Sequence, residues 1–282
     1  MPLTELVHYF NKRNQFARGG AQEEGLEFSA GRVRARVGNR LLGSVFQPLV
    51  ERASGRVVGH EAHLQVLAGE GLALPAQAVF LDAQDDAELV HLDRLVRTLH
   101  ALNFLLQREQ SGGFLALNVH PQLIRAVPDH HGQVFESVLS RCGLTPDRVV
   151  LEITDDGFTD PARLACAIAE YQERGYRIAL DNFGRHSSAL DRLEVLAPDI
   201  VKLDRSLAGH GSHLALARRV VSELVPEIRR LCMLITSQHI EHAEQLELAK
   251  DLDIDWLQGH FLGHPDQDCK PIVKPRRRRL AA

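Results

Sequence analysis

The sequence lacks several features that would at once assign it to a class of protein. None of its apolar runs reaches the roughly 18 residues that a membrane-spanning helix needs. Its N-terminal segment is amphipathic, without the uninterrupted apolar core and small-residue cleavage site of a secretory signal. The sequence therefore predicts a cytoplasmic protein with no membrane span.

Closely spaced cysteines are also absent. The four cysteines (Cys142, Cys166, Cys232 and Cys269) are far apart, with no CxxC pair, and each falls in or beside an apolar segment. This pattern favours buried free thiols over a zinc site or a disulfide framework.

A strong excess of one charge is missing as well. The net charge of -4 argues against a body that binds nucleic acid. The basic run Lys274–Arg279 is the local exception, and it is typical of a solvated tail or of a contact for acidic protein, anionic lipid or nucleic acid. We expect three parts: a helical and polar N-terminal extension (1–40), a regular body (41–268) and a basic C-terminal tail (269–282).

The body begins with two strand-like runs, Val45–Val50 and Val57–Leu67, which a short turn joins into an antiparallel pair. Helices and strands then alternate, which is typical of a parallel sheet covered by helices. About eight strands favour a barrel. The fold class is thus α/β, an irregular (β/α)8 TIM-type barrel with an antiparallel first strand. The later expected helices are 92–106, 134–139, 162–171, 214–231 and 243–252, and the later expected strands are 114–119, 149–154, 176–183, 200–203, 233–236 and 256–262.

Polar residues recur within or just after these strands, where a barrel of this kind places its site. A polar side chain in an apolar strand needs a partner, because unpaired burial costs several kcal/mol. Carboxylate and amide oxygens suit Mg²⁺ or Mn²⁺, with Ca²⁺ as a competitor, and a nearby lysine indicates metal-assisted hydrolysis of a phosphate ester. These residues are Glu61, Asn118, Glu152, Asp181, Lys202, Gln238 and Gln258.

Short segments around these residues match, in order, the motifs of one family. The segments are Phe46–Pro48, Gly59–Gln65, Leu117–Val119, Leu151–Asp155, Ala179–Gly184, Val201–Asp204, Ser237–Glu241 and Gln258–His260. Together they resemble the EAL domain. The resemblance implies an irregular barrel whose active members use two divalent cations to hydrolyse cyclic di-GMP to linear pGpG.

Carried over to this sequence, the resemblance implies roles for individual residues. Glu61, Asn118, Glu152 and Asp181 would bind the first metal, and Asp181 would bridge to the second. The catalytic set would be Lys202 beside the nucleophilic water, Glu61, and Glu241 supporting the site from behind. Ligand contacts would come from Gln47, Gln65, Asn182, Gln238 and Gln258.

The sequence departs from the family pattern at positions that matter for chemistry. Asn182 and Gln238 stand where the family has two acidic ligands of the second metal, so five acidic positions become three. Each lost charge costs roughly 2–4 kcal/mol of attraction for a cation at about 4 Å. Gln65 replaces a phosphate-binding arginine, His63 replaces a leucine and His186 a glycine. We expect at most one metal site to be intact.

These departures favour a degenerate EAL protein that does not hydrolyse cyclic di-GMP and acts by contacting a protein partner. Nucleotide sensing and a homodimer stay open, and nucleic acid is expected only at the basic tail. Two enzymatic hypotheses also stay open: an active two-metal cyclic di-GMP phosphodiesterase, and an enzyme acting on another phosphorylated substrate. Of the 15 histidines, His130, His131, His210 and His213 are expected to be solvated or structural, whereas His239 and His260 are expected at the mouth of the pocket.

Overall fold

A computed structural model describes seven stretches of the chain: residues 3–13, 25–107, 113–127, 132–154, 160–185, 190–209 and 211–269. The basic run Lys274–Arg279 and His186 lie outside the described residues, so the expectations for them stay predictions.

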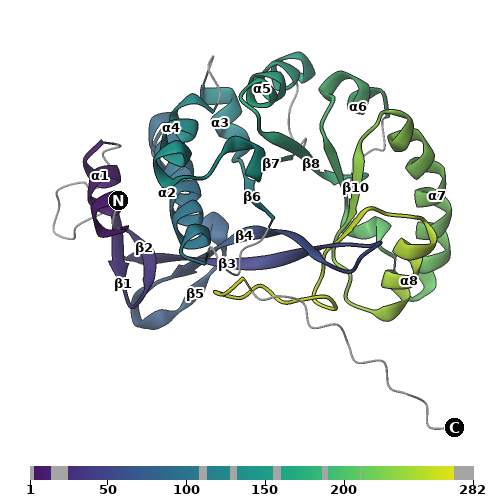
Figure 1. Ribbon diagram of the computed structural model, residues 1–282, viewed down its shortest axis with the longest axis horizontal. Coiled ribbons are helices and arrows are strands. Elements are labelled where there is room, and N and C mark those ends of the chain that lie inside the picture. The colour runs from purple at the N-terminus through teal and green to yellow at the C-terminus, as the bar shows by residue number, and fades with distance from the viewer. Residues whose placement is uncertain are drawn as a thin grey trace, which may run out of the picture.

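An eight-stranded barrel forms the centre of the molecule (Figure 1). Its first strand, β3, pairs antiparallel with both of its barrel neighbours, β4 and β11, while the other pairs around the barrel are parallel. This confirms the expected irregular (β/α)8 barrel with an antiparallel first strand. The barrel strands are β3 (Arg40–Glu51), β4 (Val57–Leu67), β6 (Phe114–Asn118), β7 (Val149–Thr154), β8 (Arg177–Phe183), β9 (Ile200–Leu203), β10 (Leu234–Ser237) and β11 (Trp256–Leu257).

Helices cover the outside of the barrel, in an arc from α2 to α8 in Figure 1. Aspartate caps fix where two of them begin: Asp85 accepts the backbone N–H of Glu88, and Asp160 accepts that of Arg163. The sequence did not predict α3 and α6, which are only six and seven residues long. The helices are α2 (Asp86–Leu105), α3 (Pro121–Ala126), α4 (Gln133–Cys142), α5 (Pro161–Glu173), α6 (Leu190–Leu196), α7 (Leu214–Arg230) and α8 (Ala243–Asp251), with 3-10 turns η1 (Gly69–Gly71), η2 (Ala76–Val79), η3 (Pro146–Arg148), η4 (Arg205–Leu207) and η5 (Gly211–His213).

The N-terminal stretch contains the expected short helix, α1 (Leu3–Arg13), and two strands that the sequence did not predict. These strands, β1 (Gly25–Ser29) and β2 (Arg32–Val37), extend the barrel sheet beyond β3. At the far end of the sheet, β5 (Ala73–Leu74) pairs with β4. The Asn11 side chain binds both backbone groups of Leu26, so it covers part of the outer edge of β1.

The barrel interior holds two layers of side chains. The polar layer, at the carboxyl end, includes Asn118, Glu152, Asp181 and Lys202, and an apolar layer lies below it. The apolar layer includes Phe114 stacked on Trp256, with ring centroids 5.0 Å apart. Because side chains alternate along a strand, residues two positions apart share a face. Four residues of this apolar layer (Ala116, Val150, Ala179 and Ile200) therefore lie directly before the inward positions of Asn118, Glu152, Asp181 and Lys202. Strand alternation therefore places four expected site residues at the carboxyl end of the barrel.

Two details of the sequence interpretation were wrong. The last strand ends at Leu257 instead of Leu262, because the chain turns at Gly259 (φ +156°), where a Cβ atom would lie 2.2 Å from the backbone of Ile240. The four cysteines are free as expected, but Cys166 and Cys232 are exposed. Within the described part of the chain, no helix has the length and apolar character that crossing a membrane requires.

Candidate functional site

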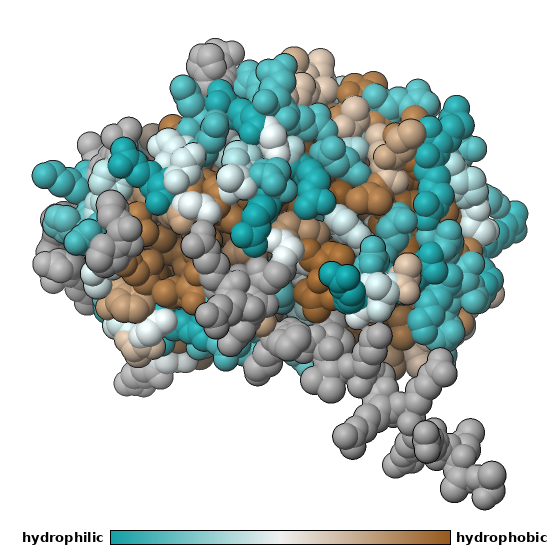
Figure 2. Space-filling view, in the orientation of Figure 1, coloured by the Kyte–Doolittle hydropathy of each residue, from teal (hydrophilic) through white to brown (hydrophobic). Residues whose placement is uncertain are grey.

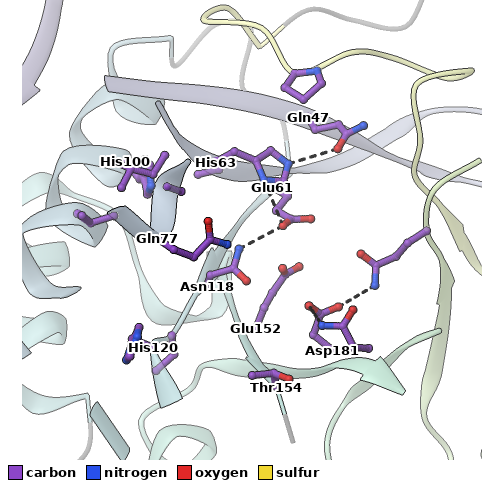
Figure 3. A pocket seen from close by; sticks show the side chains of 18 of the residues that line it. Gln47, Glu61, His63, Gln77, His100, Asn118, His120, Glu152, Thr154 and Asp181 are labelled. Atoms are coloured by element: carbon purple, nitrogen blue, oxygen red, sulfur yellow. Dashed lines mark hydrogen bonds and ion pairs between the residues drawn. The ribbon is translucent and has the colours of Figure 1, made fainter. Parts of the chain in front are cut away.

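A cavity of about 1030 Å³ opens at the carboxyl ends of the barrel strands. Figure 2 shows apolar surface at several places between polar residues on one face, and Figure 3 shows 18 of the side chains that line the cavity. The lining includes nine of the expected site residues: Gln47, Glu61, Asn118, Glu152, Asp181, Asn182, Gln238, Glu241 and Gln258. As expected, His239 and His260 line it too.

Lys202 lies under the cavity between two carboxylates. Its Nζ donates to Glu61 Oε2 at 2.9 Å and to Glu152 Oε1 at 2.6 Å. The side chains of Lys202 and Glu152 are each 1% exposed, and that of Glu61 is 8% exposed. Because such burial removes the hydration of all three charges, the lysine and the two carboxylates must satisfy one another.

Further donors surround Glu61. Gln258 Nε2 donates to Oε2 at 2.8 Å, and Asn118 Nδ2 donates to Oε1 at 3.2 Å. His63 Nδ1 lies 3.6 Å from the same Oε1, and its Nε2 lies 3.3 Å from Gln47 Oε1. The histidine that replaces the family leucine therefore makes polar contacts with two of the expected site residues.

Glu61, Glu152 and Lys202 form a buried triad with one cation. The pKa shifts of these three residues follow from that burial and from the shared charge. Burial acts to raise the pKa of Glu61, but the charges of Lys202 and His63 and the hydrogen bonds to Glu61 outweigh it and lower that pKa well below the ordinary value. Burial and the charge of Glu61 raise the pKa of Glu152 well above its ordinary value. Burial acts to lower the pKa of Lys202, yet Glu152, Glu61 and Asp181 together raise it, so the lysine stays charged.

Asp181 lies on the other side of the polar layer and is held by amides. Gln238 Nε2 donates to its Oδ1 at 2.7 Å, and Asn182 Nδ2 donates to its Oδ2 at 3.0 Å. Asn182 adopts a left-handed backbone (φ +57°), which asparagine tolerates better than most residues. The pairing of β8 with β9 is irregular between Leu180 and Phe183, so the local backbone departs from a regular strand at this point.

Two expected residues differ from the roles given to them. Gln65 is not among the described residues that line the cavity; it lines a separate depression of about 20 Å³ beside Gly43. Its role in ligand binding therefore stays a prediction. Glu241 lines the cavity with an exposed side chain, so a role in supporting the site from behind also stays a prediction.

The oxygen ligands fit a divalent cation beside Glu61 and Glu152 but not between Asp181 and the amides that hold it. Glu152 Oε2 is buried and has no hydrogen bond among the described residues, so it offers a ligand position beside Glu61, Asn118 and Asp181. As arranged here, the described residues contain no group of three acidic, histidine or cysteine side chains close enough to bind a metal. Around Asp181, amide N–H groups face the carboxylate oxygens, so this arrangement does not fit a second cation.

Sequence reasoning missed part of the cavity wall. His100 and Asp93 on α2 line it, as does the stacked pair Phe80 and His120, whose ring centroids are 5.0 Å apart. Asp93 Oδ1 accepts the backbone N–H of His120, and its other oxygen pairs with the buried Arg97. Polar residues interspersed among the apolar ones of α2 were the available signal, but they do not indicate which of them face the cavity.

The EAL domain family model matches residues 30–265 of this chain. The chain therefore belongs to the EAL domain family. It is 24% identical over 229 residues to the probable cyclic di-GMP phosphodiesterase PdeB of Escherichia coli, which covers 81% of this chain and 43% of PdeB. The chain spans about half the length of several curated relatives that it matches.

Solved structures agree with the family assignment. The Bacillus subtilis YkuI protein, in complex with cyclic di-GMP and calcium, superposes with a TM-score of 0.67 at 27% identity, over 80% of this chain and 55% of YkuI. A standalone EAL protein of Vibrio cholerae, bound to cyclic di-GMP, superposes with a TM-score of 0.71 at 19% identity, over 83% of this chain and 96% of that one. The second likeness supports the fold alone.

Proposed function

We propose that this chain is a degenerate EAL protein of cyclic di-GMP signalling that does not hydrolyse the nucleotide and acts through a protein partner. One observation carries the proposal: both carboxylate oxygens of Asp181 accept N–H groups, from Gln238 and Asn182. In a two-metal site these oxygens would face cations, and in-line displacement needs both metals to stabilise the attacking and leaving oxygens. Hydrogen bonds between amides and carboxylate take the place of that charge.

The charge of the cavity sets a condition for nucleotide sensing. Its described lining contains five carboxylates and neither lysine nor arginine, since Lys202 lies beneath it. A ligand with two phosphates would meet only negative charge unless a divalent cation came with it. Glu61, Asn118, Glu152 and Asp181 are the residues that would bind one such cation, either Mg²⁺ or Mn²⁺, with Ca²⁺ in competition. Binding of cyclic di-GMP should therefore require a divalent cation.

Calorimetric titration with cyclic di-GMP, in Ca²⁺ and then in EDTA, tests whether the protein binds the nucleotide. The same protein in Mg²⁺ and Mn²⁺, followed by chromatography for pGpG, tests hydrolysis. We expect binding only with the cation, and product no faster than in the Glu152→Ala variant. Turnover near the 10 s⁻¹ typical of enzymes would overturn the proposal. Absence of both binding and product would leave the protein partner as the route of action, to be sought by crosslinking.

An active two-metal phosphodiesterase is the second candidate. Two features support it: Lys202 donates to both Glu61 and Glu152, and the buried Glu152 Oε2 has no hydrogen bond among the described residues. Asn182 and Gln238 would then rotate so that their amide oxygens, instead of their N–H groups, face the second cation. In that case pGpG appears with the wild-type protein and disappears in both Glu152→Ala and Lys202→Ala, with circular dichroism as the control for folding.

A further inference from the structure

The depression beside Gly43, of about 20 Å³, lies where β2 and β3 separate, and none of the residues that line it also lines the cavity. The last paired positions of these two strands on this side are Ala35 and Leu42. Beyond them, the backbone N–H and C=O of Val33 bond to the side chain of Asn103, at 3.0 and 2.8 Å, instead of to β3. Because Gly43 has no side chain to fill the space that results, a depression remains between the strands.

Two polar side chains flank this depression on the same face of the sheet. On β4, Gln65 lies directly opposite Gly43. On β2, Arg34 lies between Val33 and Ala35, which are buried on the other face. Arg34 and Gln65 therefore lie two strand spacings apart, about 10 Å, with the glycine between them.

The charge of the depression is the reverse of the charge of the cavity. Its described lining contains Arg32 and Arg34 and no carboxylate, whereas that of the cavity has five carboxylates and neither lysine nor arginine. Arg32 pairs with Asp268, but Arg34 forms no hydrogen bond or ion pair with the described residues. Glu27 lies opposite Arg34 on β1, yet its Oε2 approaches Arg36 Nη2, at 3.8 Å. An anion is therefore favoured in the depression.

The amide donors at the floor of the depression are already used, whereas those at its sides are not. At the floor, Asn103 Nδ2 donates to Val33 O at 2.8 Å and to Ser44 Oγ at 3.2 Å, which uses both of its N–H groups. At the sides, the Gln65 amide, like the Arg34 guanidinium, has no hydrogen-bonding partner in the described part of the chain. A guanidinium and an amide on either side of one glycine suit the two oxygens of a carboxylate.

Size, charge and neighbouring side chains favour the carboxylate of a protein side chain over a phosphate. The depression has about the volume of one water-sized group. Its one unpaired arginine balances a single negative charge, whereas a phosphate group carries about two at pH 7. Leu41 and Leu67, which lie opposite each other on β3 and β4 and line the depression, offer apolar contact to the methylene groups of a glutamate.

We propose that the depression beside Gly43 is a docking point for a glutamate side chain of the protein partner, with its carboxylate bound by Arg34 and Gln65. Arginine is among the residues that contribute most to protein interfaces, so one such contact can anchor a partner. That the glutamate belongs to a partner rests on the proposed function. The binding of a carboxylate at this place does not, because it needs neither a metal nor the polar layer.

A matched pair of small probes tests the depression without nucleotide, metal or partner. N-acetyl-glutamate N-methylamide and N-acetyl-glutamine N-methylamide have the same frame, and only the first carries a charge. In ¹⁵N-labelled protein, the Nε–H signal of Arg34 and the Nε2–H signals of Gln65 should shift with the glutamate probe. We expect this probe to bind at least about fivefold more tightly than the glutamine probe, because hydrogen bonds to a charged group are the stronger ones. Inorganic phosphate, titrated in the same way, should bind more weakly than the glutamate probe.

Two variants and two matched controls locate the effect. Arg34→Gln removes the cation, whereas Gly43→Ala keeps it and fills the depression, since the added Cβ would lie 3.4 Å from Gln65 Oε1. Each should weaken binding of the glutamate probe at least about threefold. The controls are Arg219→Gln, in an exposed ion pair, and Gly69→Ala, where an added Cβ meets nothing within 4 Å; both should leave binding unchanged.

Several results would overturn the proposal. They are equal affinities for the glutamate and glutamine probes, no response at Arg34, tighter binding of phosphate, or a glutamate response that survives in Arg34→Gln or Gly43→Ala. Circular dichroism checks that the variants fold, and the comparison of probes on the wild-type protein needs no variant. Turnover of cyclic di-GMP would overturn the proposed function instead and would leave these binding results as they stand.

Discussion

The two sides of the polar layer stabilise their carboxylates in different ways. On one side, Glu61 and Glu152 share the buried cation of Lys202. On the other, Asp181 forms no direct ion pair among the described residues; the amides Gln238 and Asn182 hold it, and Lys202 acts on it only from a distance. The first arrangement balances charge with charge, whereas the second satisfies one charge with neutral donors.

The proposed function rests on this difference between the two sides. Neutral amides satisfy Asp181 without any added ion, so this side does not depend on a metal for its stability. The side around Lys202 is more sensitive, because removing one partner of a buried ion pair leaves an uncompensated charge.

The largest effect is expected from removing the shared cation. Lys202→Met leaves Glu61 and Glu152 buried without their lysine, 2.9 and 2.6 Å away in the intact protein. We expect the free energy of unfolding to fall by roughly 3–5 kcal/mol, as for other broken buried pairs. Urea denaturation monitored by circular dichroism measures this change.

A second substitution shows whether charge is the cause. Adding Glu152→Gln to Lys202→Met removes one of the stranded carboxylates and should recover part of the lost stability. Ca²⁺ should also stabilise Lys202→Met more than it stabilises the wild-type protein, since a cation can replace the lysine charge. A loss below 1 kcal/mol in Lys202→Met would contradict the view that this lysine holds the triad together.

The next effect is expected from returning charge to the amide side. Asn182→Asp together with Gln238→Glu surrounds Asp181 with two further carboxylates, in place of the donors that now hold it. We expect Mn²⁺ to bind at least about 100-fold more tightly, because two charges near a divalent ion are worth several kcal/mol. Calorimetry measures the affinity, and pGpG formation should rise with it.

The gain should be specific to this side of the site. Gln84→Glu adds a carboxylate at an exposed position outside the cavity lining and should leave Mn²⁺ affinity unchanged. Without metal, the double variant should be less stable than the wild-type protein, since its carboxylates repel one another. If Mn²⁺ affinity stays within threefold of the wild-type value, the amides are not what limits metal binding.

The sequence predicted much of the fold because the barrel strands carry strong apolar patterns. It missed β1 and β2, although Arg32–Val37 alternates charged and apolar residues and the buried Val33 and Ala35 follow that alternation. It also made the last strand too long, since the contact of Gly259 with Ile240 that ends it joins residues distant in the chain. In this second case, a tertiary contact decides where the strand ends.

The sequence predicted the site to a similar extent. Its errors there also concern residues whose place depends on how distant segments pack. Strand ends predicted that Glu152, Asp181 and Lys202 would meet, because alternation along parallel strands fixes which face they share. Alternation also puts Gln65 on the face of Glu61, yet it does not fix how far along the strand the cavity extends. That His100 faces the cavity depends on how α2 packs against β3, which no local pattern determines.

The smallest effect concerns a second contrast, between the two buried basic groups Lys202 and His100. Lys202 keeps its charge because carboxylates surround it, whereas burial without such a partner holds His100 neutral, with a pKa of about 3. In the unfolded chain this pKa returns to the ordinary 6.5. Below that pH the unfolded state therefore binds a proton that the folded state does not, and stability falls as the pH drops from 6.5 towards 3, by roughly 1.4 kcal/mol per pH unit.

Between pH 6 and pH 5, the difference in slope between the wild-type protein and His100→Phe reports His100, because the other groups with shifted pKa values, His120 and Glu152 among them, are common to both proteins. His100→Phe should lose the expected slope in this interval, while His264→Phe, on the exposed surface, should keep it. Urea denaturation at the two pH values gives the difference directly. Equal slopes in the wild-type protein and His100→Phe would mean that His100 takes up a proton in the folded state. Both buried basic groups, His100 and Lys202, would then be cations, and the contrast between them would disappear.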